Sequence, residues 1–230
     1  MPEPLSPASG WAVLHLFCRV DAGRTDGQAA AAAVEQARAD DHQVVTFAVL
    51  GHKADIGFMA AGPDLWRLRA LQTALQAAGL APVDSYLSLT EVSEYAGGVA
   101  EPVRNNRIYP KLPPKGKRAI CFYPMSKRRQ PGQNWYTLPF ERRLELMHEH
   151  GASGRRFHGR IVQLVTGSTG VDDYEWGVTL FGQHPDDLKA AVYTMRYDEA
   201  SAVYAEFGPF TTGIIGEVAE VLGQLGVDAG

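Results

Sequence analysis

Cysteine is scarce in this sequence of 230 residues. Only Cys18 and Cys121 occur, and both stand in apolar, strand-like segments. There is no Cys-x-x-Cys pair and no Cys/His cluster, so the cysteines indicate neither a zinc site nor a disulfide framework. We expect two buried free thiols in a reducing compartment.

Long apolar runs and an excess of basic charge are also missing. No run approaches the roughly 20 apolar residues that a membrane helix needs. Residues 1–10 lack the basic and apolar regions of a signal peptide. The formal net charge of −4 gives no support to nucleic-acid binding through overall charge. We therefore expect a cytoplasmic protein with no membrane span and no nucleic-acid partner.

Motifs of several common enzyme classes are absent. The chain has no GxGxxG or GxxxxGK[ST] phosphate-binding loop, no HExxH zinc motif and no GxSxG nucleophile elbow. Residues 171–176 place three carboxylates together, which a metal site or an acid pair would need. A hairpin turn with acidic residues explains the same stretch more simply.

The order of apolar segments predicts two similar halves, residues 11–95 and 118–222. In the first half we predict strands at 11–20, 42–50, 55–61 and 83–92, and helices at 26–40 and 63–78. In the second half we predict strands at 118–125, 160–167, 174–181 and 202–215 (broken near Gly208), and helices at 139–150 and 185–197. Each half then has the βαββαβ order of a ferredoxin-like unit.

Two further observations complete the predicted α+β organisation. Residues 50–68 and 169–191 share a hairpin, an apolar strand and a Pro-led helix, which indicates an internal duplication. Residues 96–117 are expected to be a linker, residues 1–10 a disordered tail and residues 223–230 a second tail. Two such sheets with helices outside either pack face to face or curl into an α+β barrel.

The chemically richest stretch is 121–151. We predict that its strand ends at Pro124, and that a following helix is capped by Thr137 and ends at Gly151. Tyr123 on the strand and His150 near the helix end would then face one cavity.

Each of these side chains also has a simpler explanation. A neutral imidazole such as that of His150 can bind iron through one nitrogen, but a histidine near a helix C-terminus often only interacts with the helix dipole. Tyr123, with Lys127 beyond it, can move protons or form a radical, or can simply point its hydroxyl into water. Trp135 is either a pocket wall or core, and core is the simpler assignment.

Positive charge gathers near this expected cavity. Basic residues of the second half are joined by those of the linker: Arg128, Arg129, Arg155, Arg156, Arg196, Arg104, Arg107, Lys111, Lys115 and Lys117. Arginine binds carboxylates through paired hydrogen bonds, so a planar apolar ligand rimmed by carboxylates would suit the site. A solvated basic face is the alternative.

Long blocks of the second half resemble one known family. CFYPMSKRR (121–129), NWYTLP (134–139), EHGASGRRFHGRIVQLVTGSTGVDDYEWGVTLF (149–181) and MRYDEASAVYAEFGPF (195–210) closely resemble the coproheme decarboxylases of the chlorite dismutase-like superfamily. The resemblance covers nearly all of residues 104–215 and, more loosely, the first half.

The resemblance implies a dimeric α+β barrel made of two ferredoxin-like halves in one chain, assembled as a homopentamer. It implies that the C-terminal half binds iron coproporphyrin III, which is both substrate and redox cofactor. Hydrogen peroxide would drive the conversion of two propionates to vinyls, giving haem b. A transient contact with a coproporphyrin ferrochelatase is a further partner that we expect.

The resemblance also implies roles for individual residues. It makes Tyr123 the radical-forming residue, Lys127 the residue that assists the second decarboxylation, and His150 the axial iron ligand. Residues expected to contact the porphyrin or its propionates are Trp135, Arg107, Arg196 and Ser201.

Gln163 occupies the distal position, where the sequence departs from two related patterns. Chlorite dismutases carry an arginine there, and one branch of decarboxylases uses a histidine as base. Glutamine is neutral and no strong base, which argues against chlorite decomposition. Two alternatives stay open: a haem-binding or haem-delivery protein, and a chlorite dismutase or peroxidase-like enzyme on the same fold.

Overall fold

The computed structural model of the chain describes residues 2–98 and 100–230. Residue 1 of the expected tail and residue 99 of the expected linker lie outside the described residues. The first half consists of β1 (Ala12–Arg19), α1 (Gly27–Ala39), β2 (Gln43–Val49), β3 (Ile56–Gly62), α2 (Leu65–Ala77) and β4 (Ala81–Thr90). These elements follow the predicted order, and their ends lie within a few residues of the predicted ones.

A short helix, α3 (Glu101–Ile108), lies between the halves. The second half consists of β5 (Ala119–Lys127), β6 (Arg129–Gln130), β7 (Gln133–Asn134), a 3-10 turn η1 (Trp135–Thr137), α4 (Phe140–Arg155), β8 (Ile161–Gly167), β9 (Trp176–Gly182), α5 (Pro185–Met195), α6 (Glu199–Ala202), β10 (Ala205–Phe207), β11 (Thr211–Ile215) and α7 (Val218–Gln224). The break that was predicted near Gly208 separates β10 from β11.

Nine of the eleven described strands form one antiparallel sheet that closes on itself, and β6 and β7 form a separate hairpin. Its order is β10-β5-β11-β2-β3-β1-β4-β8-β9, and β5 also pairs with β9. Each half contributes four neighbouring strands in ferredoxin-like order, β4-β1-β3-β2 and β8-β9-β5-β11. Two further pairings, β4 with β8 and β2 with β11, join the halves. The α+β barrel is therefore confirmed, and the face-to-face alternative is not.

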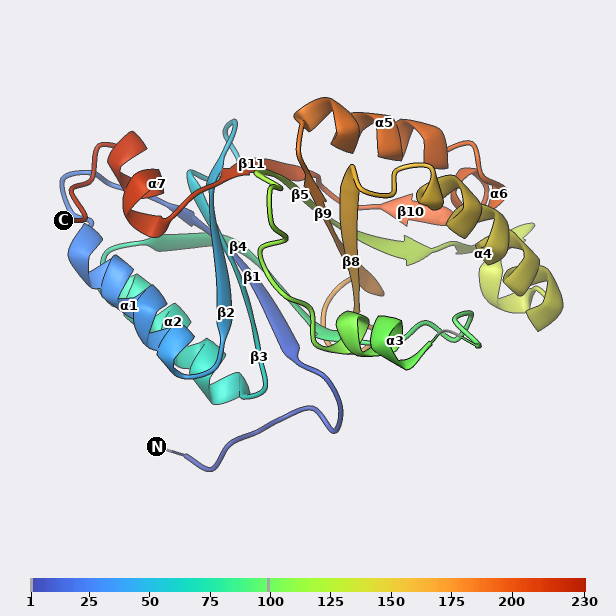
Figure 1. Ribbon diagram of the computed structural model, residues 1–230, viewed down its shortest axis with the longest axis horizontal. Coiled ribbons are helices and arrows are strands. Elements are labelled where there is room, and N and C mark those ends of the chain that lie inside the picture. Colours follow the sequence, from blue (N-terminus) through green and yellow to red (C-terminus); the bar gives the residue numbers. More distant parts are fainter. Residues whose placement is uncertain (1, 99) are drawn as a thin grey trace.

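Helices cover the outside of the barrel in two groups, which lie at opposite ends of Figure 1. Helices α1, α2 and α7 cover the first half, and α4, α5 and α6 cover the second. No helix within residues 2–98 and 100–230 is both long and apolar enough to cross a membrane.

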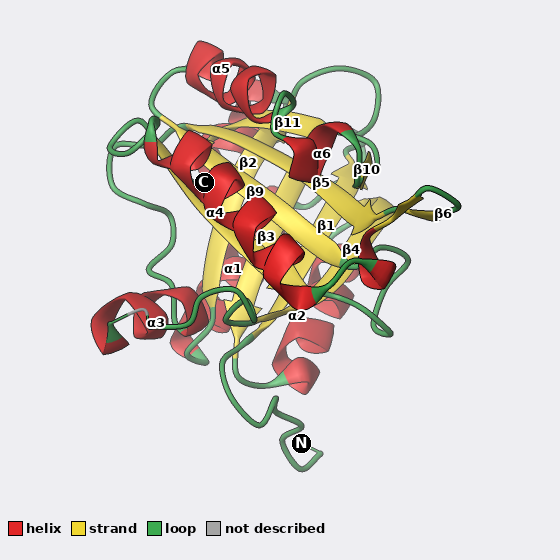
Figure 2. Cartoon of the chain, turned by 90° about the vertical axis from the view of Figure 1, so that its right-hand side faces the viewer, coloured by secondary structure: helices red, strands yellow, loops and turns green. Residues whose placement is uncertain are grey.

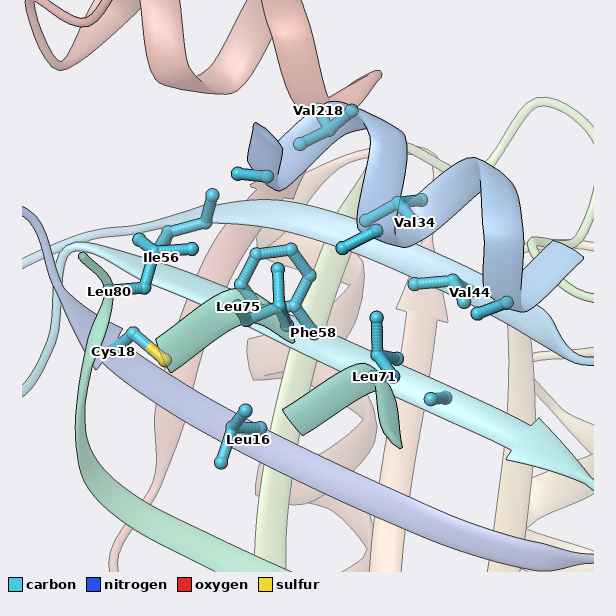
Figure 3. Close-up of a cluster of buried hydrophobic side chains, with 14 of the residues drawn as sticks. Leu16, Cys18, Val34, Val44, Ile56, Phe58, Leu71, Leu75, Leu80 and Val218 are labelled. Atoms are coloured by element: carbon cyan, nitrogen blue, oxygen red, sulfur yellow. The ribbon is translucent and has the colours of Figure 1, made fainter. Parts of the chain in front are cut away.

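The outer face of the first half is fully packed. Small side chains such as Ala30 and Ala33 let α1 lie close to the sheet, and Leu71 and Leu75 of α2 pack beside them on Phe58 (Figure 3). Leu75 is completely buried. The side chains of the two helices pack against those of the strands in one buried cluster.

The barrel interior is mostly aromatic and aliphatic, but it also holds polar groups. His15 is fully buried there, 2.9 Å from the hydroxyl of Thr179 and stacked on Phe122. Burial lowers the pKa of His15 to about 3, so its ring is neutral at physiological pH. Cys18 and Cys121 are buried free thiols, as predicted, and both lie on the outer face of the sheet.

The prediction that Pro124 ends its strand is wrong. Strand β5 continues to Lys127, with Pro124 opposite Gly177 of β9. Along its other edge β5 pairs first with β11 and then with β10, and the carbonyl of Pro124 accepts the Gly208 N–H at 2.8 Å in the break between them. The strand tolerates proline there because no regular partner needs its missing N–H.

The predicted cap and the predicted C-terminal end of the following helix are also wrong, while its start lies one residue from the predicted one. Thr137 lies in the 3-10 turn, where its hydroxyl donates to the Asn134 carbonyl at 2.9 Å, and α4 begins only at Phe140. The helix passes through Gly151 and ends at Arg155. Gly151 does not have the positive φ that favours glycine at a helix C-terminus.

The pattern of apolar residues did not predict helices α3 and α7. Helix α3 buries no side chain, so it has no apolar stripe to detect. Helix α7 buries Val221 and Leu222 and extends two residues into the expected tail. Residues 2–10 form no helix or strand, although the backbone of Leu5 is hydrogen-bonded to Asp64 and Leu65. The division into halves, linker and tails stays a prediction.

Two glycine-to-alanine substitutions should change the free energy of unfolding in opposite directions. A Cβ at Gly57 of β3 would lie 2.3 Å from ring atoms of buried Phe47, so Gly57→Ala should lower it by about 1–3 kcal/mol. A Cβ at Gly154 of α4 meets only Met195 at 3.7 Å, so Gly154→Ala should raise it by about 0.5–1 kcal/mol. Urea unfolding measures both, and a loss of stability in Gly154→Ala would contradict the open space beside α4.

Candidate functional site

A large cavity lies on the outside of the second half, in the position that is packed solid in the first. It has a volume of about 1240 Å³ and is bounded by the outer faces of β5, β8 and β9, by α4 and α5, and by segments before and after α3. Figure 2, which looks at this half of the molecule, shows α4 in front of the sheet and α5 above it. All eight residues singled out from the sequence line it: Arg107, Tyr123, Lys127, Trp135, His150, Gln163, Arg196 and Ser201.

His150 reaches the cavity from α4, five residues before the helix end. Its Nδ1 lies 3.1 Å from Oδ2 of Asp198 and 3.5 Å from the hydroxyl of Ser201. The other oxygen of Asp198 accepts the Ser153 hydroxyl at 2.7 Å, which fixes the carboxylate. An Nδ1–H that donates to Asp198 leaves Nε2 with a free lone pair, the arrangement of a metal-binding histidine.

The surroundings of His150 keep the ring neutral. Burial lowers the pKa of His150, and the nearby charge of Lys127 lowers it further, while Asp198 acts in the opposite direction. A neutral imidazole supported by a carboxylate is a donor set that fits iron in a porphyrin.

Tyr123 stands on the sheet wall of the same cavity. It is 7% exposed, stacks on Phe210 at 4.4 Å between centroids and meets the edge of Phe207 at 5.7 Å. Burial raises the pKa of its phenol, so the hydroxyl keeps its proton. Among the described residues this hydroxyl has no hydrogen-bond partner, which leaves it available to a ligand.

Lys127 lies four residues after Tyr123 on β5. Its Nζ donates to the carbonyl of Ala200 at 2.6 Å and lies 4.2 Å from the centroid of the Trp135 ring. Burial lowers the pKa of Lys127 to about 8, against the opposite effect of Glu175. Trp135 is 2% exposed, so it is both core and cavity wall.

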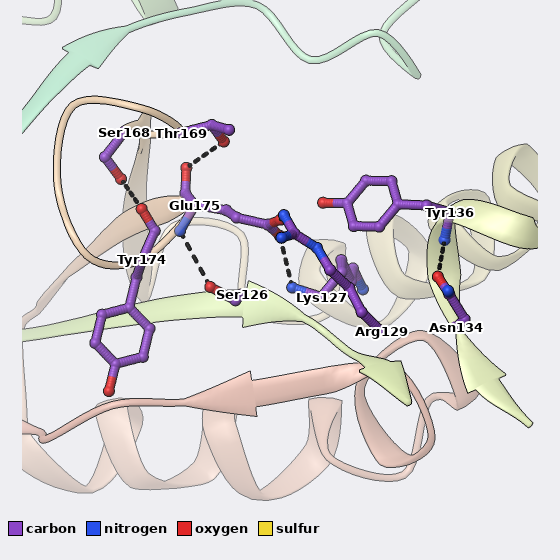
Figure 4. A network of polar contacts seen from close by, with 9 residues as sticks. All are labelled: Ser126, Lys127, Arg129, Asn134, Tyr136, Ser168, Thr169, Tyr174 and Glu175. Atoms are coloured by element: carbon purple, nitrogen blue, oxygen red, sulfur yellow. Dashed lines mark hydrogen bonds and ion pairs between the residues drawn. The ribbon is translucent and has the colours of Figure 1, made fainter. Parts of the chain in front are cut away.

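Glu175 holds the segment that carries Lys127 (Figure 4). Its carboxylate accepts the Lys127 N–H at 2.8 Å and pairs with Arg129 of β6, and its own N–H donates to Ser126 at 3.1 Å. The acidic stretch 171–176 thus supports a hairpin. No group of carboxylates, histidines or cysteines in the described part of the chain is placed to hold a metal ion.

The remaining predicted residues lie at the cavity rim. Arg107 of α3 and Gln163 of β8 are exposed, and Gln163 comes from the sheet wall while His150 comes from the helix wall. The guanidinium of Arg196 is 3.9 Å from the Tyr193 ring. The charged residues that line the cavity are mostly cationic: Arg107, Lys111, Lys127, Arg155 and Arg196 against Glu91 and Glu94.

Sequence reasoning missed two residues of the site. Asp198, which orients His150, stands three residues before Ser201 and so was within a block already recognised. Tyr95 accepts the Arg143 Nε–H at 3.0 Å and meets the edge of Trp135 at 6.2 Å. No local pattern pointed to Tyr95, because it lies in a loop of the other half.

Asp198→Asn should lower the pKa of His150, because the carboxylate is the group that favours the charged imidazole. An NMR pH titration of the ligand-free protein measures the change. Glu199→Gln is a matched control, since Glu199 pairs with Arg142. An unchanged or higher pKa in Asp198→Asn would contradict the hydrogen bond between the two side chains.

Comparisons with known proteins identify the family of the chain. The family model described as chlorite dismutase matches residues 24–216. A Staphylococcus carnosus protein named coproheme decarboxylase is 39% identical over 93% of this chain and 94% of its own length. A Natronomonas pharaonis protein, named as a candidate heme-binding protein, is also 39% identical over 93% of this chain. The chain spans only 40% of the length of that protein.

Solved structures share the fold. A Thermus thermophilus structure described as a novel heme-binding protein superposes with a TM-score of 0.83, at 34% identity over 98% of this chain and 99% of its own. A mutant chlorite dismutase from Candidatus Nitrospira defluvii superposes with a TM-score of 0.75 over 96% and 97% of the two chains. Its 17% identity supports the fold alone. Family match, identity and barrel together show that the chain belongs to the chlorite dismutase family.

Proposed function

We propose that the chain catalyses the hydrogen-peroxide-dependent oxidative decarboxylation of two propionates of iron coproporphyrin III, giving the vinyl groups of haem b. One observation carries the proposal. A buried tyrosine, Tyr123, and a carboxylate-supported histidine, His150, come from opposite walls of a single cavity that also holds the ammonium of Lys127.

The names of the relatives support a haem-related function. Coproheme decarboxylase is the name of the S. carnosus protein, and heme binding appears in the descriptions of the N. pharaonis and T. thermophilus proteins. With the family match they favour an enzyme of the haem oxidoreductase type. The step from haem-related enzyme to coproheme decarboxylase is the proposal.

The size and charge of the cavity suit this substrate. Its volume of about 1240 Å³ exceeds the roughly 300–1,000 Å³ of most small-molecule sites. A tetrapyrrole is a large planar ligand, and the propionates at its edge match the five cations that line the cavity.

The proposed reaction balances with one peroxide for each propionate. When the carboxylate of a propionate leaves as carbon dioxide, the two remaining carbons become a vinyl group, and one proton and two electrons are released. Hydrogen peroxide takes up these two electrons, the released proton and one further proton from solvent to form two molecules of water. When bound, the iron porphyrin supplies the oxidising power, and the protein supplies binding, orientation and proton transfer.

The residues of the cavity divide these tasks. Tyr123 is shielded from water, and its hydroxyl is not hydrogen-bonded to any described residue, so it is placed to exchange a hydrogen atom with a propionate. Lys127, with a pKa of about 8, carries a charge at neutral pH and can hold a carboxylate or give a proton. His150 offers Nε2 to the iron, while Trp135, Arg107, Arg196 and Ser201 shape the porphyrin site.

A haem-binding or haem-delivery protein is the second candidate, because two relatives are described only as heme-binding. A carrier has no need for a buried tyrosine beside a buried lysine. Chlorite decomposition is disfavoured by the neutral Gln163 on the sheet wall. The homopentamer, the contact with a coproporphyrin ferrochelatase and the cytoplasmic location belong to the proposal as predictions from the family resemblance.

Tyr123→Phe should bind iron coproporphyrin but form no vinyl groups, because phenylalanine has no exchangeable hydrogen on its ring. The measurement is mass spectrometry of the porphyrin during a slow peroxide titration of purified protein. Wild type should lose two carboxyl groups in steps, through a three-propionate intermediate. Tyr136→Phe, which alters another tyrosine of the cavity, is the control and should retain the reaction.

Other results of this experiment would exclude the role of Tyr123 or favour a different function. Equal turnover by wild type and Tyr123→Phe would exclude the radical role of Tyr123. A tightly bound porphyrin that peroxide leaves unchanged would favour the carrier. Bleaching without a defined product would favour a peroxidase-like protein.

A further inference from the structure

Several side chains that can give up an electron line the same cavity, among them Tyr123, Trp135 and Trp176. Tyr123 stands on β5, and the indole of Trp135 stands in the turn that follows the β6–β7 hairpin. An oxidant in the cavity can take an electron from either ring. An indole loses an electron without first losing a proton, whereas a phenol must pass its proton to an acceptor. Geometry alone therefore does not direct oxidation to Tyr123.

We propose that the ammonium of Lys127 protects Trp135 from one-electron oxidation and so favours oxidation of Tyr123 over that of Trp135. The ammonium lies 4.2 Å from the centre of the indole ring. A cation there is attracted to the face of the neutral ring, but it repels the cation that the ring becomes when it loses an electron. The indole is thereby made harder to oxidise.

The surroundings preserve this repulsion. Lys127 is 9% and Trp135 2% exposed, so water and salt screen the two groups poorly. The Nζ atom is held by the carbonyl of Ala200 at 2.6 Å, a neutral partner that leaves the full charge in place. The carboxylate that raises the pKa of Lys127, that of Glu175, is engaged by Arg129 and by the backbone N–H of Lys127. Burial leaves the pKa of Lys127 at about 8, so the charge is present at pH 7.

Tyr123 has no such cation over its ring among the described residues. Its neighbours there are Phe207 and Phe210. Its phenol can be oxidised once a proton acceptor is bound beside it, and a carboxylate of the substrate class proposed above is such an acceptor. Lys127 would thus be a positioning residue that acts through Trp135, in addition to any contact with substrate. The source of the oxidant and the carboxylate that accepts the proton of Tyr123 rest on the proposed function.

The test uses the full chain without porphyrin and a separate oxidant, so its outcome is independent of decarboxylation. A photoexcited ruthenium(II) trisbipyridyl complex gives an electron to persulfate, and the resulting ruthenium(III) takes one electron from an indole. The indole radical cation releases its N–H proton to water and is trapped by oxygen. Peptide mass spectrometry then measures oxidation at Trp135, with Trp66, distant in the first half, as the internal reference.

Lys127→Gln removes the charge and keeps a hydrogen-bond donor, and Lys127→Arg keeps the charge. At pH 7, oxidation of Trp135 relative to Trp66 should rise roughly tenfold in Lys127→Gln and stay near the wild-type value in Lys127→Arg. If Lys127→Gln does not fold, as circular dichroism would show, Lys127→Met is the neutral variant. An unchanged ratio in the neutral variant, or an equal rise in Lys127→Arg, would overturn the proposal.

Discussion

The pairing of β5 with β9 is the interaction on which the rest of the structure depends. It holds the sheet of the second half together and, with the β4–β8 and β2–β11 pairings, closes the two ferredoxin-like halves into one barrel. Alternation along β5 then divides its side chains between two environments. Ile120 and Phe122 fill the barrel interior, while Tyr123 and Cys121 belong to the outer layer. A strand in this position is rigid, which is what a precisely placed side chain such as that of Tyr123 requires.

The two halves share one architecture but differ in how their outer layers are packed. In the first half, alanines on α1 and leucines on α2 fill the outer layer completely. In the second half, α4 buries only Leu146 fully, and its glycines Gly151 and Gly154 face the open volume. The first half therefore supplies the larger part of the packed core, and the second half gives up packing for a cavity. The glycines that interrupt the helical pattern of α4 are explained by this need for space.

Most of the fold followed from sequence because its strands and helices have clear periodicity and because the halves repeat one another. The errors lie around the cavity. Pro124 and Gly151 are normally breakers, but the strand break at Gly208 accommodates the first and the cavity beside α4 accounts for the second. The support of His150 by Asp198 depends on α6 lying beside α4, a contact between segments 48 residues apart. Local pattern carries no information on such contacts, and only the family resemblance drew attention to the block that contains Asp198.

The central claim is that the cavity of the second half holds an iron porphyrin with His150 at the iron. The most direct measurement is a crystal structure of the protein with iron coproporphyrin, with anomalous scattering recorded at the iron edge. The account predicts an iron peak next to Nε2 of His150, with the macrocycle between α4 and the outer face of β8. A peak away from His150, for example in the smaller pocket beside Cys121 and Phe210, would contradict it.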